Sequence, residues 1–553
     1  MSEENAIPIT VGVVGHLDVV TTEKHRKQIL QLFKDLIAKY PNSPVYLFSS
    51  VAEGADRFVA KIFLGLKYSG KEYINRMELI IPTPFHAEEY KRDFNEESAR
   101  EFDDFIKMAK VSFCVNDGGY SGDRPQQYLR AGKFVADSSI ILVALWDGEK
   151  GKKGGTADVV RHKFAGDDEN VADSTFEYDG SVFVLPCKRT TSAEGIPDTI
   201  INTPDLTLDL VLQDPAIREA LERIEHINAL PSMDEEPGFK QSQIHLFRYH
   251  EKLDMSQKLL MNWYSIFDLL SVKFRTRDIV ITLWLFLFGL FFIITLEVYT
   301  NLSPTGLILG AAMFFIAAAT IIYRYSKSTA NHRKYLINRT VAEALRIQFY
   351  WNIAGIGKNV SDYFLRIHRK DFTWVKHLLS AIYGITYNNR PITSGIIADL
   401  TDNWVKDQRD FFRSSIRKMT QQIGFYNRIS NVSFILAFGL LVSIFFAGSF
   451  YKTNNLLNEL LVVIGTFLGI FALIKAYLQM KGYNQLMNQY EMMKVIYDRA
   501  ESKISETDTY GLNQEEKNAY LKELFFVIGR EALIENGNWY QIFKEKEPEI
   551  EGI

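Results

Sequence analysis

The sequence has 553 residues and a formal net charge of −4 at pH 7. Because a protein that binds duplex nucleic acid carries a basic surplus, this balance argues against nucleic acid as a partner. Two cysteines, Cys114 and Cys187, lie in separate apolar segments, which argues against a disulfide framework and favours a reducing compartment. The acidic N-terminus lacks the apolar segment of a cleavable signal, so we expect the first 270 residues to lie in the cytosol.

The first 190 residues alternate short apolar segments with amphipathic ones. The apolar, β-branched segments predict six strands, at 9–14, 45–48, 77–82, 111–115, 140–146 and 182–185. Helical spacing between them predicts helices that begin after Thr21 or Thr22 and near residues 55, 126 and 156, and one charged helix at 88–110. This alternation indicates an α/β fold with a doubly wound, largely parallel, Rossmann-like sheet.

Glycine, hydroxyl and acidic residues follow the ends of these strands. Ligands of doubly wound sheets bind beyond the carboxyl ends of the strands, near the point where the strand order reverses. Glycine lets backbone N–H groups approach a phosphate, and the helix N-terminus behind it adds about half a positive charge. We therefore predict a nucleotide or phosphate site built from Gly15, His16, Ser49, Ser50, Glu53, Gly54, Pro82, Asp147, Gly154, Gly155 and Thr156.

Five ordered segments carry a family likeness: Val11-Gly12-Val13-Val14-Gly15-His16, Ala52-Glu53-Gly54-Ala55-Asp56-Arg57, Tyr90 with Asp93-Phe94, Ala144-Leu145-Trp146-Asp147-Gly148, and Gly154-Gly155-Thr156-Ala157-Asp158-Val159-Val160. Together they resemble the SLOG superfamily, which groups nucleotide-sensing domains of the LOG, Smf/DprA and TRPM-channel types. The resemblance covers about residues 7–190 and implies that Asp56, Arg57, Tyr90 and Asp158 join the site. Leu17 stands where the pattern has an arginine, so the phosphate contact is expected from Arg57 instead.

The same resemblance bears on catalysis. LOG-type phosphoribohydrolases carry a glutamate three residues after the threonine of the last glycine turn, and Val159 occupies that position here. Asp158 comes one residue early, which on a helix rotates it by about 100° from the catalytic position. We therefore expect binding without hydrolysis, with Asp158 as a first-turn partner of the helix or a ribose acceptor. A membrane-tethered nucleotide phosphoribohydrolase and a non-catalytic membrane scaffold remain the alternatives.

The candidate residues also have purely structural interpretations. A glycine at a strand end can simply make a tight βα turn, and His16 can be a structural histidine. Glu53, Asp56 and Arg57 can make ordinary helix-start interactions. The sequence shows no Cys/His spacing typical of zinc, no Walker A segment and no Gly-x-Gly-x-x-Gly segment, so we predict neither a metal nor a cofactor.

Two apolar hairpins follow, with predicted spans at 279–298 and 306–323 and then at 431–450 and 459–478. Each span matches a hydrocarbon core of roughly 30 Å. Lys and Arg cluster before the first and third spans and after the second and fourth, whereas the two hairpin loops hold one basic residue, Lys452. The positive-inside rule then predicts a multi-pass protein of the inner (cytoplasmic) membrane with both termini in the cytosol.

The spans carry no ionisable residue near their centres, which argues against a proton pump or an ion-coupled transporter. Gly306 with Gly310, and Gly465 with Gly469, supply small residues that favour close helix packing.

The two halves form a loose repeat, with Glu343-Ala344-Leu345-Arg346 after the first hairpin and Glu531-Ala532-Leu533-Ile534 after the second. This arrangement is similar to SLATT domains, membrane modules of bacterial conflict systems. We expect a SLOG-like domain at 1–190, a connector at 191–240, and hairpin modules at 241–400 and 401–553. The resemblance implies an oligomeric anti-phage effector in the lipid bilayer that opens a pore on binding a nucleotide or ADP-ribose-type second messenger, and a signal-producing enzyme encoded alongside.

Overall fold

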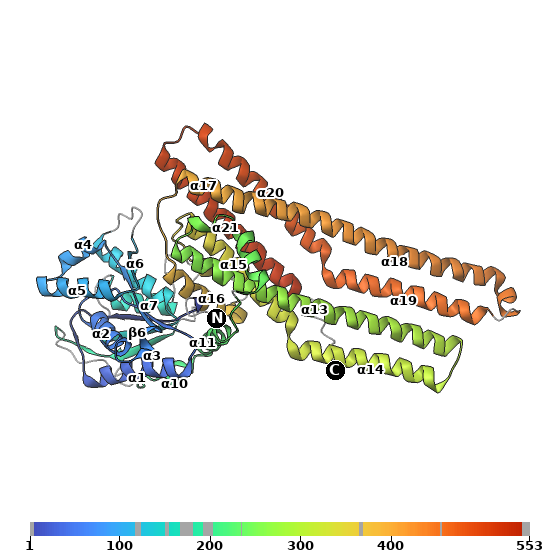
Figure 1. Ribbon diagram of the computed structural model, residues 1–553, viewed down its shortest axis with the longest axis horizontal. Helices are drawn as coiled ribbons and strands as arrows, with labels where there is room; N and C mark the ends of the chain where they lie inside the picture. Colours follow the sequence, from blue (N-terminus) through green and yellow to red (C-terminus); the bar gives the residue numbers. More distant parts are fainter. Residues whose placement is uncertain are drawn as a thin grey trace. The chain divides into compact units, whose positions relative to one another are not determined.

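The computed structural model describes residues 5–116, 123–149, 154–165, 181–191, 203–233, 235–363, 369–453 and 456–544. The chain is divided into two compact units (Figure 1). The first comprises Met1–Trp263 and Ala344–Ile397, and is called the sheet unit below. The second comprises Tyr264–Glu343 and Ala398–Ile553, and is called the helical unit.

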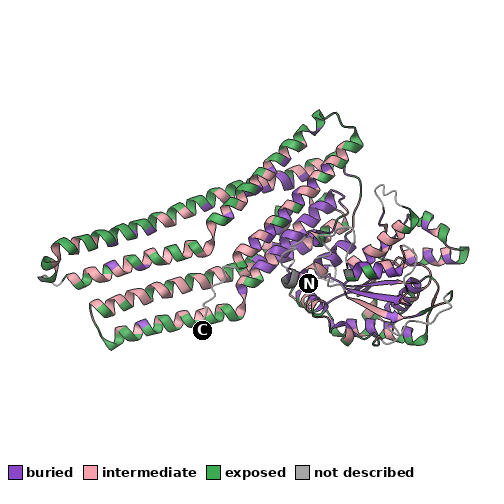
Figure 2. Cartoon of the chain, turned by 180° about the vertical axis from the view of Figure 1, so that it is seen from behind, coloured by how far each residue is buried: buried purple, intermediate pink, exposed green. Residues whose placement is uncertain are grey.

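A six-stranded parallel sheet forms the core of the sheet unit. The strands follow the order β5-β4-β3-β1-β6-β7, and every neighbouring pair is parallel. Their bounds are β1 Ile9–Gly15, β3 Val45–Phe48, β4 Met77–Thr83, β5 Val111–Cys114, β6 Ile141–Trp146 and β7 Val182–Pro186. All six predicted strands are confirmed. The central strands are buried, as expected for a parallel sheet that helices cover on both faces (Figure 2).

The helices of the α/β alternation are α1 Glu23–Lys39, α2 Ala55–Lys67, α3 Lys71–Ile74, α4 Ala87–Tyr90, α5 Glu96–Met108, α6 Arg124–Ser138 and α7 Thr156–Ala165. Thr22, one of the two predicted caps, begins α1 in a capping box with His25. The prediction of a single helix at 88–110 is wrong. The helical conformation ends after α4 and a 3₁₀ turn. Asn95 then accepts a hydrogen bond from the Ser98 N–H at 2.9 Å and starts α5 as a new helix. A short antiparallel pair, β2 Val19–Val20 with β8 Lys188–Arg189, was not predicted.

Two later segments complete the sheet unit. The connector holds α10 Leu208–Val211, α11 Pro215–Asn228 and α12 Pro237–Leu246. Asn228, at the end of α11, bonds to both the N–H and the C=O of Ile7 at 2.9 and 2.8 Å. The described residues of 344–397, a segment predicted to lie in the first hairpin module, belong to the sheet unit. They include α16 Arg369–Ile385, whose Tyr383 ring lies 5.6 Å from Phe134 of α6.

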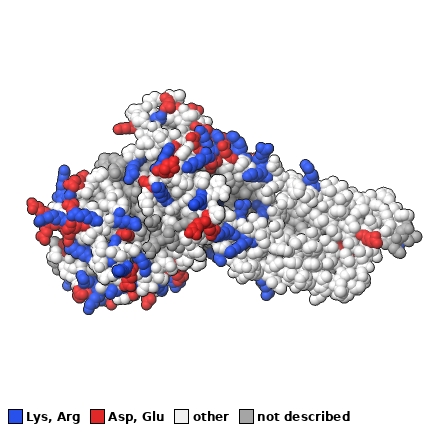
Figure 3. All heavy atoms as spheres, viewed as in Figure 1, with Lys and Arg blue, Asp and Glu red and all other residues white. Residues whose placement is uncertain are grey.

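The helical unit contains four helices that are long and apolar enough to span a membrane. The helices that contribute to this unit are α13 Met255–Asn301, α14 Gly306–Thr329, α15 Asn331–Ile353, α17 Ser394–Leu400, α18 Asp407–Thr453, α19 Leu457–Lys481, α20 Tyr483–Glu506 and α21 Gln514–Lys544. A π-helical turn, Thr401–Lys406, joins α17 to α18. Each predicted span lies inside one of α13, α14, α18 and α19. Figure 3 shows these segments as an almost uncharged surface, and many of their large apolar side chains are exposed.

Residues of both halves of the loose repeat meet in this unit. Asn536 of α21 donates to the Thr340 C=O of α15 at 3.1 Å, and the rings of Tyr335 and Trp539 lie 5.7 Å apart. The helices that follow the two hairpins therefore pack directly on each other.

Glycines allow α19 to approach α13. A Cβ atom at Gly469 would lie 2.8 Å from Ile293 Cγ2, and one at Gly465 would lie 2.2 Å from the Glu297 carboxyl carbon. By contrast, apart from the adjacent residues and backbone of its own helix, a Cβ at Gly306 or Gly310 would have no atom of the described residues within 4 Å. The second glycine pair thus packs within the chain, and the first does not.

Replacing Gly469 by leucine is expected to destabilise the helical unit by about 1–3 kcal/mol, because the added side chain must displace Ile293. Gly310→Leu is the matched control and is expected to change stability by less than about 0.5 kcal/mol. Thermal unfolding of the full chain in detergent compares the two. Equal losses would contradict the α13–α19 packing.

Candidate functional site

The strand order reverses between β1 and β6. From β1 the chain moves outward through β3, β4 and β5, and it then returns to β6 on the other side of β1. Ligands of open parallel sheets bind at the carboxyl ends of the strands at such a switch point. His16 follows β1 and Asp147 follows β6, so the topology brings these two predicted site residues to the switch point.

His16 and Asp147 form a buried pair there. The Nε2 atom of His16 lies 2.8 Å from Oδ1 of Asp147, and the two residues are 7% and 3% exposed. The same Oδ1 accepts from the N–H of Glu149 at 3.0 Å. Oδ2 of Asp147 is buried and has no hydrogen-bond partner among the described residues. A buried acceptor without a partner is costly, and a ligand hydroxyl would satisfy it.

Gly15 and Gly54 bring the start of α2 against the end of β1. Gly54 has φ +80°, and a Cβ there would lie 2.2 Å from the Leu17 carbonyl oxygen. A Cβ at Gly15 would lie 2.3 Å from that of Ala55, whose N–H donates to the His16 C=O at 3.1 Å. Both glycines are therefore required by close packing. The same packing points the N-terminus of α2, which lacks a side-chain cap, toward the switch point.

The turn after β3 is strained at Val51. This β-branched, buried residue has φ +46°, a left-handed conformation that such side chains rarely adopt. Ser49 Oγ accepts from the Val51 N–H at 3.1 Å, and Arg57 Nε donates to the Val51 C=O at 3.0 Å. The hydroxyl of Ser50 donates to the Pro82 C=O at 2.8 Å. Ser49, Ser50, Arg57 and Pro82 thus hold one turn next to the switch point.

Arg57 is buried and binds other parts of the protein. Its Nη1 donates to the Ser98 C=O and hydroxyl at 3.1 and 2.6 Å and to Glu101 Oε2 at 2.8 Å. Its guanidinium carbon lies 4.6 Å from the centre of the Phe94 ring. Nη2 is buried without a hydrogen-bond partner among the described residues. The predicted phosphate contact would have to use Nη2, because the other nitrogens are engaged. Leu17, where the pattern has arginine, is 64% exposed.

Asp56 and Tyr90 lie beneath this turn. Burial raises the pKa of Asp56 to about 7, although hydrogen bonds from the Ala52 and Ser50 backbone and the Ser49 side chain favour the charged form. Tyr90 is 1% exposed, and its hydroxyl has no hydrogen-bond partner among the described residues. Burial, followed by the nearby Asp56, raises the Tyr90 pKa well above its usual value. Both groups are therefore predominantly neutral below pH 7.

The last glycine turn opens α7. Gly154 has φ +85°, and a Cβ there would lie 2.3 Å from the Pro125 carbonyl oxygen. Asp158 Oδ2 accepts from the Gly154 N–H at 2.8 Å, and Oδ1 lies 3.4 Å from Arg161 Nη1. Asp158 thus holds the first turn of its helix, which was one of the two roles expected for it.

In the structure, the predicted site residues lie in three groups that are next to one another. Gly15, His16, Gly54 and Asp147 surround the switch point, and Ser49, Ser50, Asp56, Arg57, Pro82 and Tyr90 form or border the β3 turn. Gly154, Gly155, Thr156 and Asp158 lie at the start of α7, which packs on β1 and β6. Glu53 is partly exposed in the loop before α2.

Sequence reasoning missed three partners of this site. Ser98 and Glu101 hold Arg57 from a helix that carries no motif. Asn116, just after β5, donates to the Pro84 C=O at 2.7 Å, and its Oδ1 is buried without a partner among the described residues. Its position directly after a predicted strand was the signal that would have found it.

The described residues contain no group of three or more His, Cys, Asp or Glu side chains arranged to hold a metal ion. A scan of the sequence against protein-family models finds no match, and a search of curated proteins finds no similar sequence. The resemblance to SLOG and SLATT domains therefore stays a prediction.

Proposed function

We propose that this protein is a membrane effector. Its sheet unit binds a nucleotide-derived second messenger, and its four apolar helices form or open a pore in response. The observation that carries the binding half is the buried His16–Asp147 pair at the strand switch point, with one Asp147 oxygen left without a partner. A ribose hydroxyl fits that oxygen, and the nearby N-terminus of α2 suits a phosphate.

The membrane half is supported by four helices of membrane-spanning length and composition. We place both termini on the cytosolic side of the inner membrane, because Lys and Arg cluster at the ends of the spans away from the hairpin loops. The sparse charge on these helices favours a pore formed by several copies of the chain rather than by one. An anti-phage role, in which the open pore halts growth of the infected cell, follows from the resemblance to conflict-system proteins.

Chain connectivity supplies a route between the two halves. The chain passes between the units at 263/264, 343/344 and 397/398. These positions fall inside α13, α15 and α17 respectively. A shift of the sheet unit on ligand binding would therefore reach the long helices through helical backbone rather than through loose linkers. The ligand must favour the open arrangement by several kcal/mol to change its population from minor to dominant.

The binding half is tested with His16→Ala and a matched control. His162 is buried and forms a second pair with the half-buried Asp137, also at 2.8 Å, but this pair lies near the C-terminal ends of α6 and α7. We expect His16→Ala to weaken binding about 10- to 100-fold, because Asp147 loses the hydrogen bond from His16 that holds its carboxylate in place at the site. His162→Ala should leave the affinity unchanged. Calorimetry of the full chain against cyclic nucleotides and ADP-ribose measures both.

Two outcomes would contradict the proposal in different ways. Equal affinity in wild type and His16→Ala would remove the switch point as the site. If wild type binds a nucleotide but releases no dye from liposomes at saturating ligand, the pore half fails while the binding half stands.

A further inference from the structure

A groove in the helical unit lies between the two hairpins. It has a volume of about 290 Å³, and its walls come from α13, α18 and α19. Seven of its nine lining residues are aliphatic or phenylalanine, and the other two are Tyr426 and Tyr477. The lining residues fall at 283–290 on α13 and at 470–477 on α19, and all of them except Leu290 lie in the cytosolic half of their predicted span. The groove therefore runs along one leaflet of the bilayer.

Tyrosines mark the end of the groove that faces the cytosol. The rings of Tyr426 and Tyr477 lie 5.2 Å apart, and Phe286 of α13 contacts Tyr477 at 5.7 Å. Tyr483, just past the end of α19, donates to Gln422 Oε1 at 3.2 Å. Amphipathic rings of this kind prefer the boundary between hydrocarbon and water.

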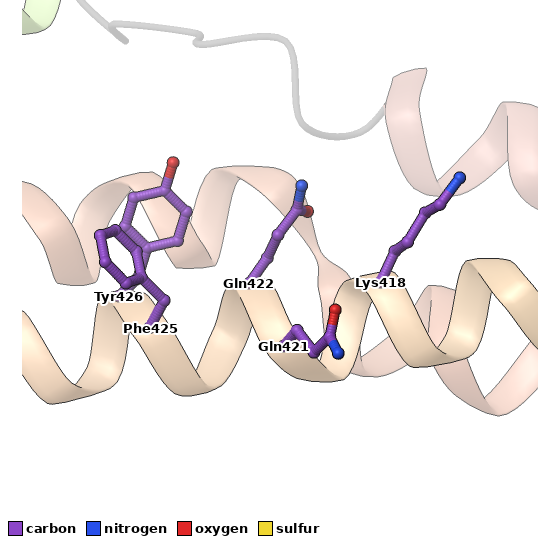
Figure 4. A pocket seen from close by; sticks show the side chains of 5 residues that line it. All are labelled: Lys418, Gln421, Gln422, Phe425 and Tyr426. Atoms are coloured by element: carbon purple, nitrogen blue, oxygen red, sulfur yellow. The ribbon is translucent and has the colours of Figure 1, made fainter.

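A polar hollow adjoins the groove at Tyr426, which lines both. It is lined by Lys418, Gln421, Gln422, Phe425 and Tyr426, and has a volume of about 260 Å³. Figure 4 shows Lys418, Gln422 and Tyr426 projecting from the same side of α18, at intervals of four residues. Lys418 makes no ion pair with any described residue. Arg275 and Lys481 add positive charge near Tyr483 and Tyr477.

We propose that the groove and the hollow next to it together form a binding site for a phospholipid with an anionic headgroup. One acyl chain would lie against the apolar walls, and the headgroup would accept hydrogen bonds from Lys418 and the neighbouring amides. A water-soluble metabolite is disfavoured by the apolar walls, and a neutral lipid would leave the cationic end without a partner. Basic pockets between membrane helices on the cytosolic side suit anionic headgroups, at about 1 kcal/mol for each Lys or Arg.

The bound lipid would contact both hairpins, because the groove walls come from α13 of the first and from α18 and α19 of the second. The amount of anionic lipid in the membrane would then influence how the hairpins pack. This inference rests on the membrane placement in the proposed function, but not on ligand binding by the sheet unit.

The test uses the full chain in detergent with dioleoyl phosphatidylglycerol or dioleoyl phosphatidylcholine added, and native mass spectrometry to count retained lipid. We expect preferential retention of phosphatidylglycerol by wild type and a loss of about tenfold or more in Lys418→Glu. Arg417→Glu is the matched control, because it reverses the same charge one residue away outside the groove lining. Its retention should stay near that of wild type.

A second pair of variants tests the apolar end. Leu287→Trp fills the groove and should also abolish the preference. Leu309→Trp enlarges a leucine of α14 that is equally exposed, 37% against 38%, but does not line the groove, and it should have no effect. Equal retention of the two lipids by wild type, or equal losses in each variant and its control, would overturn the inference.

Flotation with phosphatidylcholine vesicles separates the two possible failures. If wild type does not float with the vesicles, the membrane placement itself is wrong. If it floats but shows no preference for phosphatidylglycerol, only the lipid site is wrong.

Discussion

Replacing Arg57 by alanine is expected to lower the free energy of unfolding of the sheet unit by about 3–5 kcal/mol, because the Val51 C=O, the Ser98 C=O and the Ser98 hydroxyl each lose a hydrogen bond from a buried charged donor. Arg57 is 4% exposed and binds two different segments, the Val51 turn and, through Ser98 and Glu101, helix α5. The variant would also free the strained Val51 conformation from one of the two contacts that hold it. The effect should be concentrated in β3, α2 and α5.

Lys61→Ala is the matched control. Lys61 pairs with the same Glu101 carboxylate at 2.5 Å, but its side chain is 59% exposed. An exposed pair of this kind contributes about 0–1 kcal/mol. Hydrogen–deuterium exchange of the full chain measures both variants, because it reports the opening free energy of the sheet strands separately from the long helices. Similar small losses in the two variants would contradict the assigned role of Arg57.

The strands of the sheet were predictable because each carries its own local signal. An apolar segment such as 45–48 predicts a strand from its own residues, without information from the rest of the chain. The order of the strands depends on contacts between residues far apart in the sequence. Only the structure therefore showed that β1 and β6 are neighbours. That neighbourhood is what joins His16 to Asp147, two residues that the sequence identified separately.

The parts that the sequence did not reveal depend on distant partners. Residues 344–397 have ordinary helical periodicity, which indicates an apolar face but not what covers it. In the structure that face includes Tyr383 and Gly384, which pack on β3 through Phe48 and on α6 through Phe134 and Ser138. Similarly, nothing in the identity of a valine predicts φ +46° at position 51, because that conformation is imposed by Ser49 and Arg57.

Asp56 should give the sheet unit a pH dependence of unusual sign. Burial raises the pKa of its carboxyl from 3.8 to about 7, so between these values the folded chain holds a proton that the unfolded chain has released. The stabilisation that the Asp56 carboxyl contributes is therefore fully present below about pH 4 and is lost as the pH rises through 7. A difference of about three pH units corresponds to a change on the order of 4 kcal/mol.

Asp56→Asn isolates this contribution, because the amide stays neutral at every pH. Relative to wild type, the variant should gain stability from pH 5 to about pH 7 and level off above it, as measured by hydrogen–deuterium exchange in the sheet strands. Asp18→Asn is the control. At Asp18 the opposing effect of burial is outweighed by hydrogen bonds from Thr191 and Arg189, which lower the pKa to about 2. Stability from Asp18 is thus fully present above about pH 4, and its loss in the variant should be constant from pH 5 to 8. A constant difference for Asp56→Asn as well would mean that Asp56 is ionised throughout this range, and that the turn beside the switch point carries a buried negative charge facing any incoming phosphate.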